Sequence, residues 1–143
     1  DFSDWQTYRN EEYGFEFKYP LSFVYKRGEK AGEGFIFSNS RGEHSFNLVY
    51  PLGGIGFEAW HFTKDEIIKI SGGELRKIIA EPNAGSENLG SLIMLWWKQN
   101  EENNPSDVWE GQLSGMIKGN YSEKDNSNKE IVNKIISTFR FIE

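Results

Sequence analysis

The chain has 143 residues, no cysteine, and a formal net charge of −6 from 22 acidic and 16 basic side chains. A chain of this length makes a single domain, which we place over residues 1–143, and buries about 70% of its unfolded surface without help from disulfides or metal. The lack of cysteine excludes thiol catalysis and thiolate zinc sites. The acidic balance, without a basic cluster, disfavours nucleic-acid binding.

The apolar runs and the start of the chain bear on its compartment. The longest apolar run, LIMLWW at residues 92–97, is far shorter than the ~20 residues of a membrane-spanning helix, so we expect no span. The sequence starts at Asp1 without an initiator methionine, as expected of a cleaved leader or of trimming. We therefore expect an extracytoplasmic protein, secreted or anchored upstream as a lipoprotein.

The first third of the chain is predicted to be rich in strands. In the stretch NEEYGFEFKYP, the aromatic residues Phe15, Phe17 and Tyr19 alternate with charged residues, which is typical of a half-buried strand. Gly14 closes a turn before this strand, and Pro20 cannot donate to a continuing ladder. Apolar runs separated by turn residues predict strands over about 4–9, 15–19, 22–26, 34–38 and 45–50.

A helix is predicted next, beginning near Thr63. Thr63 and Glu66 have the T-x-x-E spacing of a capping box, ahead of the apolar residues in IIKI. The double glycine at 72–73 supplies a stop. Phe57 and Trp60 lie three residues apart and could extend the apolar face of this helix upstream.

The middle of the chain contains a predicted strand near 75–80 and a second one in GSLIMLWWKQN. Both faces of the second strand are apolar, so it is expected to lie in the middle of a sheet that is covered above and below by helices or long loops. This favours three layers. One face carries Ile93, Leu95 and Trp97, and the other carries Leu92, Met94 and Trp96.

The last third is predicted to contain a long strand, a helix and a short strand. VWEGQLSGMIKGNY predicts a strand whose glycines permit bending or close approach. Ser127 and Glu130 form a second capping box, and the apolar residues that follow have helical spacing, so we expect a helix from about 128 to 137. Phe139 and Phe141 return to a period of two and should tie the terminus into the sheet.

Two stretches, WQTYRNEEYGFEFKYP at residues 5–20 and IVNKIISTFRFIE at residues 131–143, resemble the PsbP-like class of bacterial extracytoplasmic domains, often found on lipoproteins. The resemblance implies an α-β-α sandwich around a mainly antiparallel sheet, an α+β fold shared with the photosystem II extrinsic protein PsbP and a Ran-binding nuclear transport factor. Both stretches specify structure. Neither contains a residue motif from which manganese, calcium or Ran binding could be assigned to particular positions of this chain.

The segment GIGFEA, from Gly54 to Ala59, has the G-x-G-x-x-A spacing of a dinucleotide site, with Glu74 about 20 residues further on. In such a site the glycines let the backbone meet a pyrophosphate at a helix N-terminus. Here the alternating strands and helices of that fold are missing on either side. We therefore interpret the segment as a glycine-rich turn.

The sequence also argues against a metal site and against a group of catalytic residues. Glu58, His61 and Asp65 would share a face if the predicted helix began early, but a solvent-facing polar surface is the simpler interpretation. The loop with Glu101, Glu102 and Asp107 lacks the spacing of a calcium loop. No serine lies in a nucleophile elbow. We expect no catalytic residue, no metal and no cofactor.

The sequence offers aromatic surface residues as the best candidates for binding. Of the five tryptophans, Trp60, beside His61, and Trp109, beside the acidic loop, are the candidates for a binding surface. We expect a non-enzymatic extracytoplasmic binding or assembly domain at the cell envelope, whose partner is another envelope protein or a small ligand. The alternative is a carbohydrate- or small-ligand-binding module that uses exposed aromatics, and a dinucleotide- or metal-dependent enzyme comes third.

Overall fold

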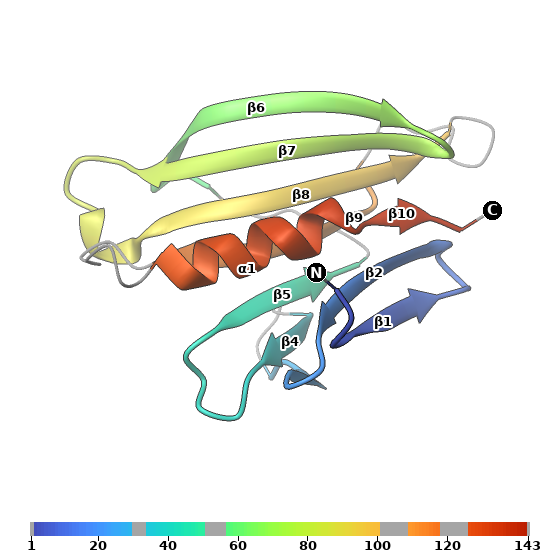
Figure 1. The fold of residues 1–143 in the computed structure, drawn as a ribbon. Coiled ribbons are helices and arrows are strands. Elements are labelled where there is room, and N and C mark those ends of the chain that lie inside the picture. The colour runs from blue at the N-terminus through green and yellow to red at the C-terminus, as the bar shows by residue number, and fades with distance from the viewer. Residues whose placement is uncertain (1, 30–33, 51–56, 101–108, 118–125, 143) are drawn as a thin grey trace.

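The computed structural model describes residues 2–29, 34–50, 57–100, 109–117 and 126–142, which form two antiparallel sheets and one α-helix (Figure 1). One sheet has seven strands in the order β3-β4-β5-β9-β8-β7-β6, and the other has three in the order β1-β2-β10. The elements are β1 (Trp5–Asn10), β2 (Phe15–Pro20), β3 (Val24–Arg27), β4 (Phe35–Ser38), β5 (Ser45–Val49), β6 (Trp60–Ile70), β7 (Gly73–Pro82), a 3-10 turn (Glu87–Leu89), β8 (Ser91–Gln99), β9 (Gly111–Ile117), α1 (Asn126–Ser137) and β10 (Arg140–Phe141).

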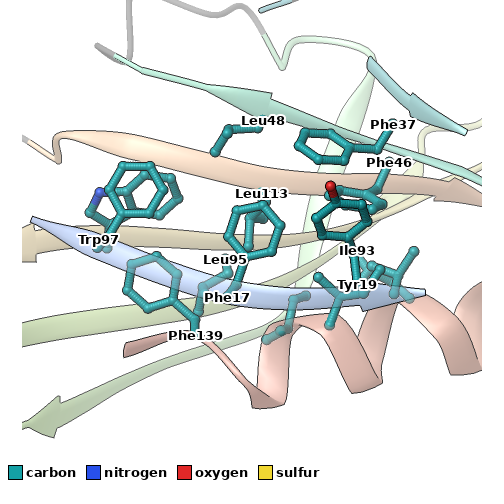
Figure 2. Close-up of a cluster of buried hydrophobic side chains, with 14 of the residues drawn as sticks. Phe17, Tyr19, Phe37, Phe46, Leu48, Ile93, Leu95, Trp97, Leu113 and Phe139 are labelled. Carbon is teal, nitrogen blue, oxygen red and sulfur yellow. The ribbon is translucent and has the colours of Figure 1, made fainter. Parts of the chain in front are cut away.

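The small sheet and α1 both pack on one face of the large sheet, which we call the inner face. The core between them is rich in aromatic rings from β2, β4, β5 and β8, and α1 contributes aliphatic side chains (Figure 2). The ring of Trp97 lies 4.8 Å from that of Phe15 and 4.8 Å from that of Phe139, centroid to centroid. The two ends of the chain are therefore held together against the C-terminal half of β8.

The predicted α-β-α sandwich is wrong. The described residues form mostly strands, and their one helix lies on the inner face. The segment predicted as a helix from Thr63 is strand β6, which pairs with β7 along its length. A β-bulge between Phe62 and Lys64 shifts the register there, so the side-chain alternation restarts and the period of two is hidden in the sequence.

Strand β8 is a central strand with two buried faces, as predicted. It lies between β7 and β9. Its inner face contributes Leu95 and Trp97 to the main core, while Met94 packs with Ile78 and Ala80 in a second cluster on the opposite, outer face. This outer cluster is covered in part by aromatic side chains of Phe57, Trp60 and Trp96 rather than by a second described helix.

Two glycines of β9 let bulky groups approach its inner face, as the sequence predicted. A Cβ atom at Gly111 would overlap the ring of Trp97, and one at Gly115 would overlap Val132 of α1. The predicted C-terminal helix is confirmed as α1. The side chain of Ser127, the predicted cap, lies outside the described residues.

The small sheet is held by an ion-paired cluster that follows from its register. Glu16 of β2 pairs with Arg9 of β1 on one side and with Arg140 of β10 on the other. Arg9 donates to the Glu16 carboxylate at 3.0 Å, and Arg140 donates to its other oxygen. Gly14, with φ of 74°, forms the predicted turn between β1 and β2, and its N–H donates to the carbonyl of Asn10.

The first prediction concerns Leu95, which is fully buried at the centre of β8. We expect Leu95→Ala to lower the free energy of unfolding by about 2 to 5 kcal/mol, because it removes buried methyl groups and leaves a cavity. Leu21→Ala is the control, since Leu21 is 66% exposed. Urea denaturation of both variants measures the effect, and a loss below about 0.5 kcal/mol at Leu95 would contradict the central placement.

The second prediction concerns acid stability and Glu16. Burial raises the pKa of Glu16, but the hydrogen bonds from Arg140 and Arg9 outweigh it, so the net pKa is lowered. A lowered folded-state pKa means that ionised Glu16 stabilises the protein above about pH 4.3, the usual value for a free glutamate, and that this stability is lost as the pH falls through the folded-state value. We expect Glu16→Gln to destabilise the protein at neutral pH.

The difference between wild type and Glu16→Gln should shrink on acidification, because the charge of Glu16, and with it the stabilisation by the two arginines, is lost as the pH falls through its lowered folded-state pKa. Thermal melts from pH 7 to pH 2.5 measure it, with the exposed Glu12 changed to Gln as the control. A gap that stays constant over this range would show that the Glu16 charge does not stabilise the small sheet.

Candidate functional site

The outer face of the large sheet carries a row of polar and aromatic side chains that the strand register places side by side. Arg76 of β7 is the cross-strand neighbour of Trp96 of β8, and Trp96 is the neighbour of Gln112 of β9. The Arg76 guanidinium lies 5.1 Å from the centroid of the Trp96 ring. The Trp96 indole N–H donates to Oε1 of Gln112 at 2.6 Å, so the ring is fixed from both sides.

Strand β6 extends this row with an ion pair. Nε and Nη2 of Arg76 donate to the two carboxylate oxygens of Asp65 at 2.7 and 2.6 Å. The hydrogen bonds from Arg76 lower the pKa of Asp65, and those to Asp65 raise the pKa of Arg76. Both groups therefore stay charged at neutral pH, and the paired carboxylate is a poor general base.

A second row lies beside the first, toward the C-terminal end of β8. Lys98 is the cross-strand neighbour of Glu74, and its ammonium lies 3.4 Å from the Glu74 carboxylate. The same ammonium lies 4.8 Å from the centroid of the Trp109 ring, which lies 6.5 Å from the Trp96 ring. We call the residues of the two rows the outer patch: Asp65, Glu74, Arg76, Trp96, Lys98, Trp109 and Gln112.

Exposed apolar side chains also lie on the outer face of the sheet. The register puts Phe62 opposite Ala80, Ile67 opposite Arg76, and Met116 opposite Leu92, so all three belong to the outer face. Their side chains are 37%, 57% and 49% exposed, respectively. Large apolar side chains gathered on one face of a protein are a feature of interaction surfaces.

The structure places the three sequence-predicted binding residues in different surroundings. Trp60 is half-buried, and its indole N–H donates to the carbonyl of Gly90 at 2.9 Å. His61 is exposed and donates from Nδ1 to Oδ1 of Asn83 at 2.9 Å. Trp109 is half-buried within the outer patch.

Trp60 and Trp109 contact opposite ends of strand β8. Trp60 is bonded to Gly90, just before the strand, and Trp109 contacts Lys98 near its end. These contact points are separated by roughly 25 Å at about 3.3 Å per residue. The structure therefore does not bring the predicted binding residues together in one site, and only Trp109 belongs to the outer patch.

The structure removes the helix that the metal hypothesis required. In strand β6 the side chains of His61 and Asp65 fall on opposite faces, because the bulge lies between them, and Asp65 is bound to Arg76. Within the described ranges, no group of three or more His, Asp or Glu residues could hold a metal ion. The predicted acidic loop with Glu101, Glu102 and Asp107 lies outside the described residues.

The structure also contradicts the helix that a dinucleotide site would need after GIGFEA. Gly54 and Gly56 lie outside the described residues, but Phe57 to Ala59 lead directly into strand β6. A pyrophosphate site of this kind needs a helix N-terminus at that point. The segment therefore does not continue as a dinucleotide-binding unit.

A pocket of about 520 Å³ lies beside the small sheet and is lined in part by Arg9, Glu16, Ser71 and Arg140. Its two arginines are both bound to Glu16, so their charges are already balanced in part by a protein carboxylate. We interpret this pocket as a by-product of the ion-paired cluster that holds the small sheet.

Sequence reasoning missed most of the outer patch, including Arg76, Lys98 and Gln112. Nothing in the sequence around these three residues marks them as a group, and the strand register is what brings them beside the tryptophans on one face. The one available signal was the pair Trp96 and Trp97, whose predicted separation onto opposite faces is confirmed.

Comparison with known proteins identifies the fold. No family model matches the sequence, and no curated protein matches it. The solution structure of cyanobacterial PsbP (CyanoP) from Synechocystis sp. PCC 6803 superposes with a TM-score of 0.66 over 97% of this chain and 93% of that chain, at 10% sequence identity. At this identity the likeness shows a PsbP-like fold and nothing about function. In the part of the chain that the structure describes, no helix has the length and apolar character of a membrane span.

Proposed function

We propose that this chain is a non-enzymatic binding or assembly domain of the cell envelope and that it holds a partner protein on the outer patch. The observation that carries the proposal is the gathering of two tryptophans, two cations and two carboxylates on one sheet face, which also carries the exposed side chains of Phe62, Ile67 and Met116. The PsbP-like fold supports it as a scaffold that displays such a face.

The composition of this face favours a protein partner. Tryptophan and arginine are the side chains that most often dominate the energy of protein interfaces, and methionine and phenylalanine are enriched there. Arg76 and Trp96 are fixed by Asp65 and Gln112 before any partner arrives. A fixed face loses little conformational entropy on binding, which favours affinity.

The same geometry favours a protein partner over a carbohydrate ligand. A sugar stacks on the open face of an aromatic ring, but here Arg76 lies over the Trp96 ring and Lys98 lies over the Trp109 ring. One face of each ring is thus occupied by a cation from the protein itself. The rings offer a sugar less surface than their position on the sheet suggests.

The outer patch also has little to offer an enzyme. Catalysis needs a nucleophile or general base whose pKa is shifted toward neutrality, together with a group that stabilises developing charge. The carboxylate of Asp65 is instead held ionised by Arg76, and Glu74 is paired with Lys98. The ionisable groups of the patch therefore stabilise the surface that they form.

The third prediction tests the outer patch with substitutions on its exposed side. We expect Met116→Asp and Trp109→Ala to weaken binding of the envelope partner by about tenfold or more, because each removes apolar contact area from the outer face, Trp109 within the patch and Met116 further along β9. Far-UV circular dichroism should stay unchanged. The control is Leu21→Asp, which places the same charge at a side chain that is 66% exposed on another part of the surface.

The measurement has two steps. Capture from an envelope extract, with quantitative mass spectrometry of wild type and variants, identifies the protein whose recovery depends on the patch, and calorimetry with that purified protein gives the affinities. Equal recovery of every captured protein by all variants would contradict the proposal. Binding of an oligosaccharide that is lost in Trp109→Ala would favour the carbohydrate module instead.

The fourth prediction concerns the compartment. We propose an extracytoplasmic protein, secreted or held at the membrane as a lipoprotein, on the basis of the resemblance at both ends of the chain and of the fold. In intact cells whose cytoplasmic control protein is protected, we expect added protease or a membrane-impermeant label to reach the full-length protein once the outer barrier is permeabilised. Protection equal to that of the cytoplasmic control would contradict this compartment.

A further inference from the structure

Strand β6 is the terminal strand of the seven-stranded sheet and the longest strand in the described part of the chain. Among the described strands it pairs only with β7, and every residue from 61 to 67 is exposed. A terminal strand presents a row of unpaired N–H and C=O groups, which another strand can bind by continuing the sheet. Of the two terminal strands of this sheet, β6 offers the longer edge, with 11 residues against four in β3.

The regular part of this edge has a well-defined centre. The bulge between Phe62 and Lys64 interrupts the strand, and from Lys64 to Ile70 the pairing with β7 proceeds residue by residue. Ile67 is the midpoint of that regular segment and is 57% exposed. A large apolar side chain exposed at the middle of a terminal strand is normally avoided, because it invites pairing.

Two copies of β6 can pair symmetrically only in certain registers. A two-fold axis that relates antiparallel edge strands stands perpendicular to the sheet, so it keeps the outer faces of both copies on the same side. Residues that face each other must then come from the same face, and the axis must pass beside one residue that meets its own copy. The possible registers differ in which residue that is.

Only the register centred on Ile67 joins an apolar pair at the axis to opposite-charge pairs on both sides of it, all on the outer face. Centring on Asp65 or Glu66 places two like charges at the axis, and centring on Ile68 places Ile67 against Lys69. Centring on Ile67 puts the exposed isoleucines together and sets Asp65 of each copy opposite Lys69 of the other. It also uses the whole regular segment, since on the inner face Glu66 then lies opposite Ile68 and Lys64 opposite Ile70. Opposite charges facing each other across strands are stabilising, and like charges are destabilising.

The charges already present on the outer face continue this pattern. Asp65 is bound to Arg76 on its own sheet, and Lys69 is the cross-strand neighbour of Glu74, which pairs with Lys98. Across the two-fold axis, acidic and basic groups would alternate from one sheet into the next. We propose that the chain forms a symmetric dimer through strand β6, with Ile67 on the axis and Asp65 opposite Lys69 of the second copy.

Sedimentation equilibrium over a concentration series tests the dimer. We expect self-association in the wild type and a monomer for Ile67→Lys, because a lysine pair at the axis replaces an apolar contact by repulsion. The control is Val24→Lys, at an exposed apolar residue of β3, the terminal strand at the other edge of the same sheet. A wild type that is monomeric at every concentration, or a dimer that Ile67→Lys leaves intact, overturns the proposal.

Charge exchange tests the register. Asp65→Lys and Lys69→Glu, each alone, should weaken self-association by about tenfold or more, because each creates like-charged pairs on both sides of the axis. An equimolar mixture of the two variants should associate again, since each copy then supplies the charge that the other requires. A dimer that contains both variants is not explained by a change in folding, and failure of the mixture to associate, with both variants folded by circular dichroism, contradicts the register.

A cysteine at the axis provides an independent readout. The chain has no cysteine of its own, so Ile67→Cys contains a single thiol that meets its copy at the proposed axis. Mild oxidation should give a covalent dimer for Ile67→Cys and much less for Val24→Cys. Equal crosslinking of the two variants, or preferential crosslinking at residue 24, overturns the proposal even if Asp65→Lys does not fold.

Discussion

Strand β8 has to bury apolar side chains on both of its faces, and the arrangement of the other elements follows from that requirement. On the inner face, the ring of Trp97 is enclosed by Phe15 near the start of the chain and Phe139 near its end, and Gly111 leaves space for it. On the outer face, Met94 is covered in part by aromatic side chains of the sheet's own strands and loops. The inner face is thus closed by whole elements, whereas the outer face keeps half-exposed rings and charges that a partner can contact.

The fold was predictable where side-chain alternation is uninterrupted. The alternating aromatics of β2 and the two apolar faces of β8 led to correct strands, and the helical spacing near the C-terminus led to α1. Strand β6 was missed because its bulge restarts the alternation after Phe62, so that Ile67 and Ile68 appear as a helical pair beside a T-x-x-E spacing. Pairing with β7 decides the structure of this segment, and local preference cannot show it.

The α-β-α sandwich, with helices on both faces of the sheet, was wrong for a related reason. Two apolar faces on one strand require a cover on both sides, but they do not specify that the cover be a helix. The ring of Trp96 lies 6.0 Å from that of Phe57 and 6.2 Å from that of Phe62. Large side chains therefore cover part of the outer face. The outer patch was beyond sequence reasoning because Arg76, Trp96 and Gln112 are joined by strand register, which alternation alone leaves open.

The outer patch and the edge of β6 are linked by the geometry of the sheet. Because the proposed axis is perpendicular to the sheet, both outer patches of a dimer face the same way, and Asp65 and Ile67 belong to the outer face in each copy. A partner with two matching surfaces would then meet two patches on one continuous sheet, and its second contact would form at a high effective concentration. Weak binding at a single patch is therefore compatible with firm attachment of the dimer, whereas a monomeric variant would retain only the weak contact.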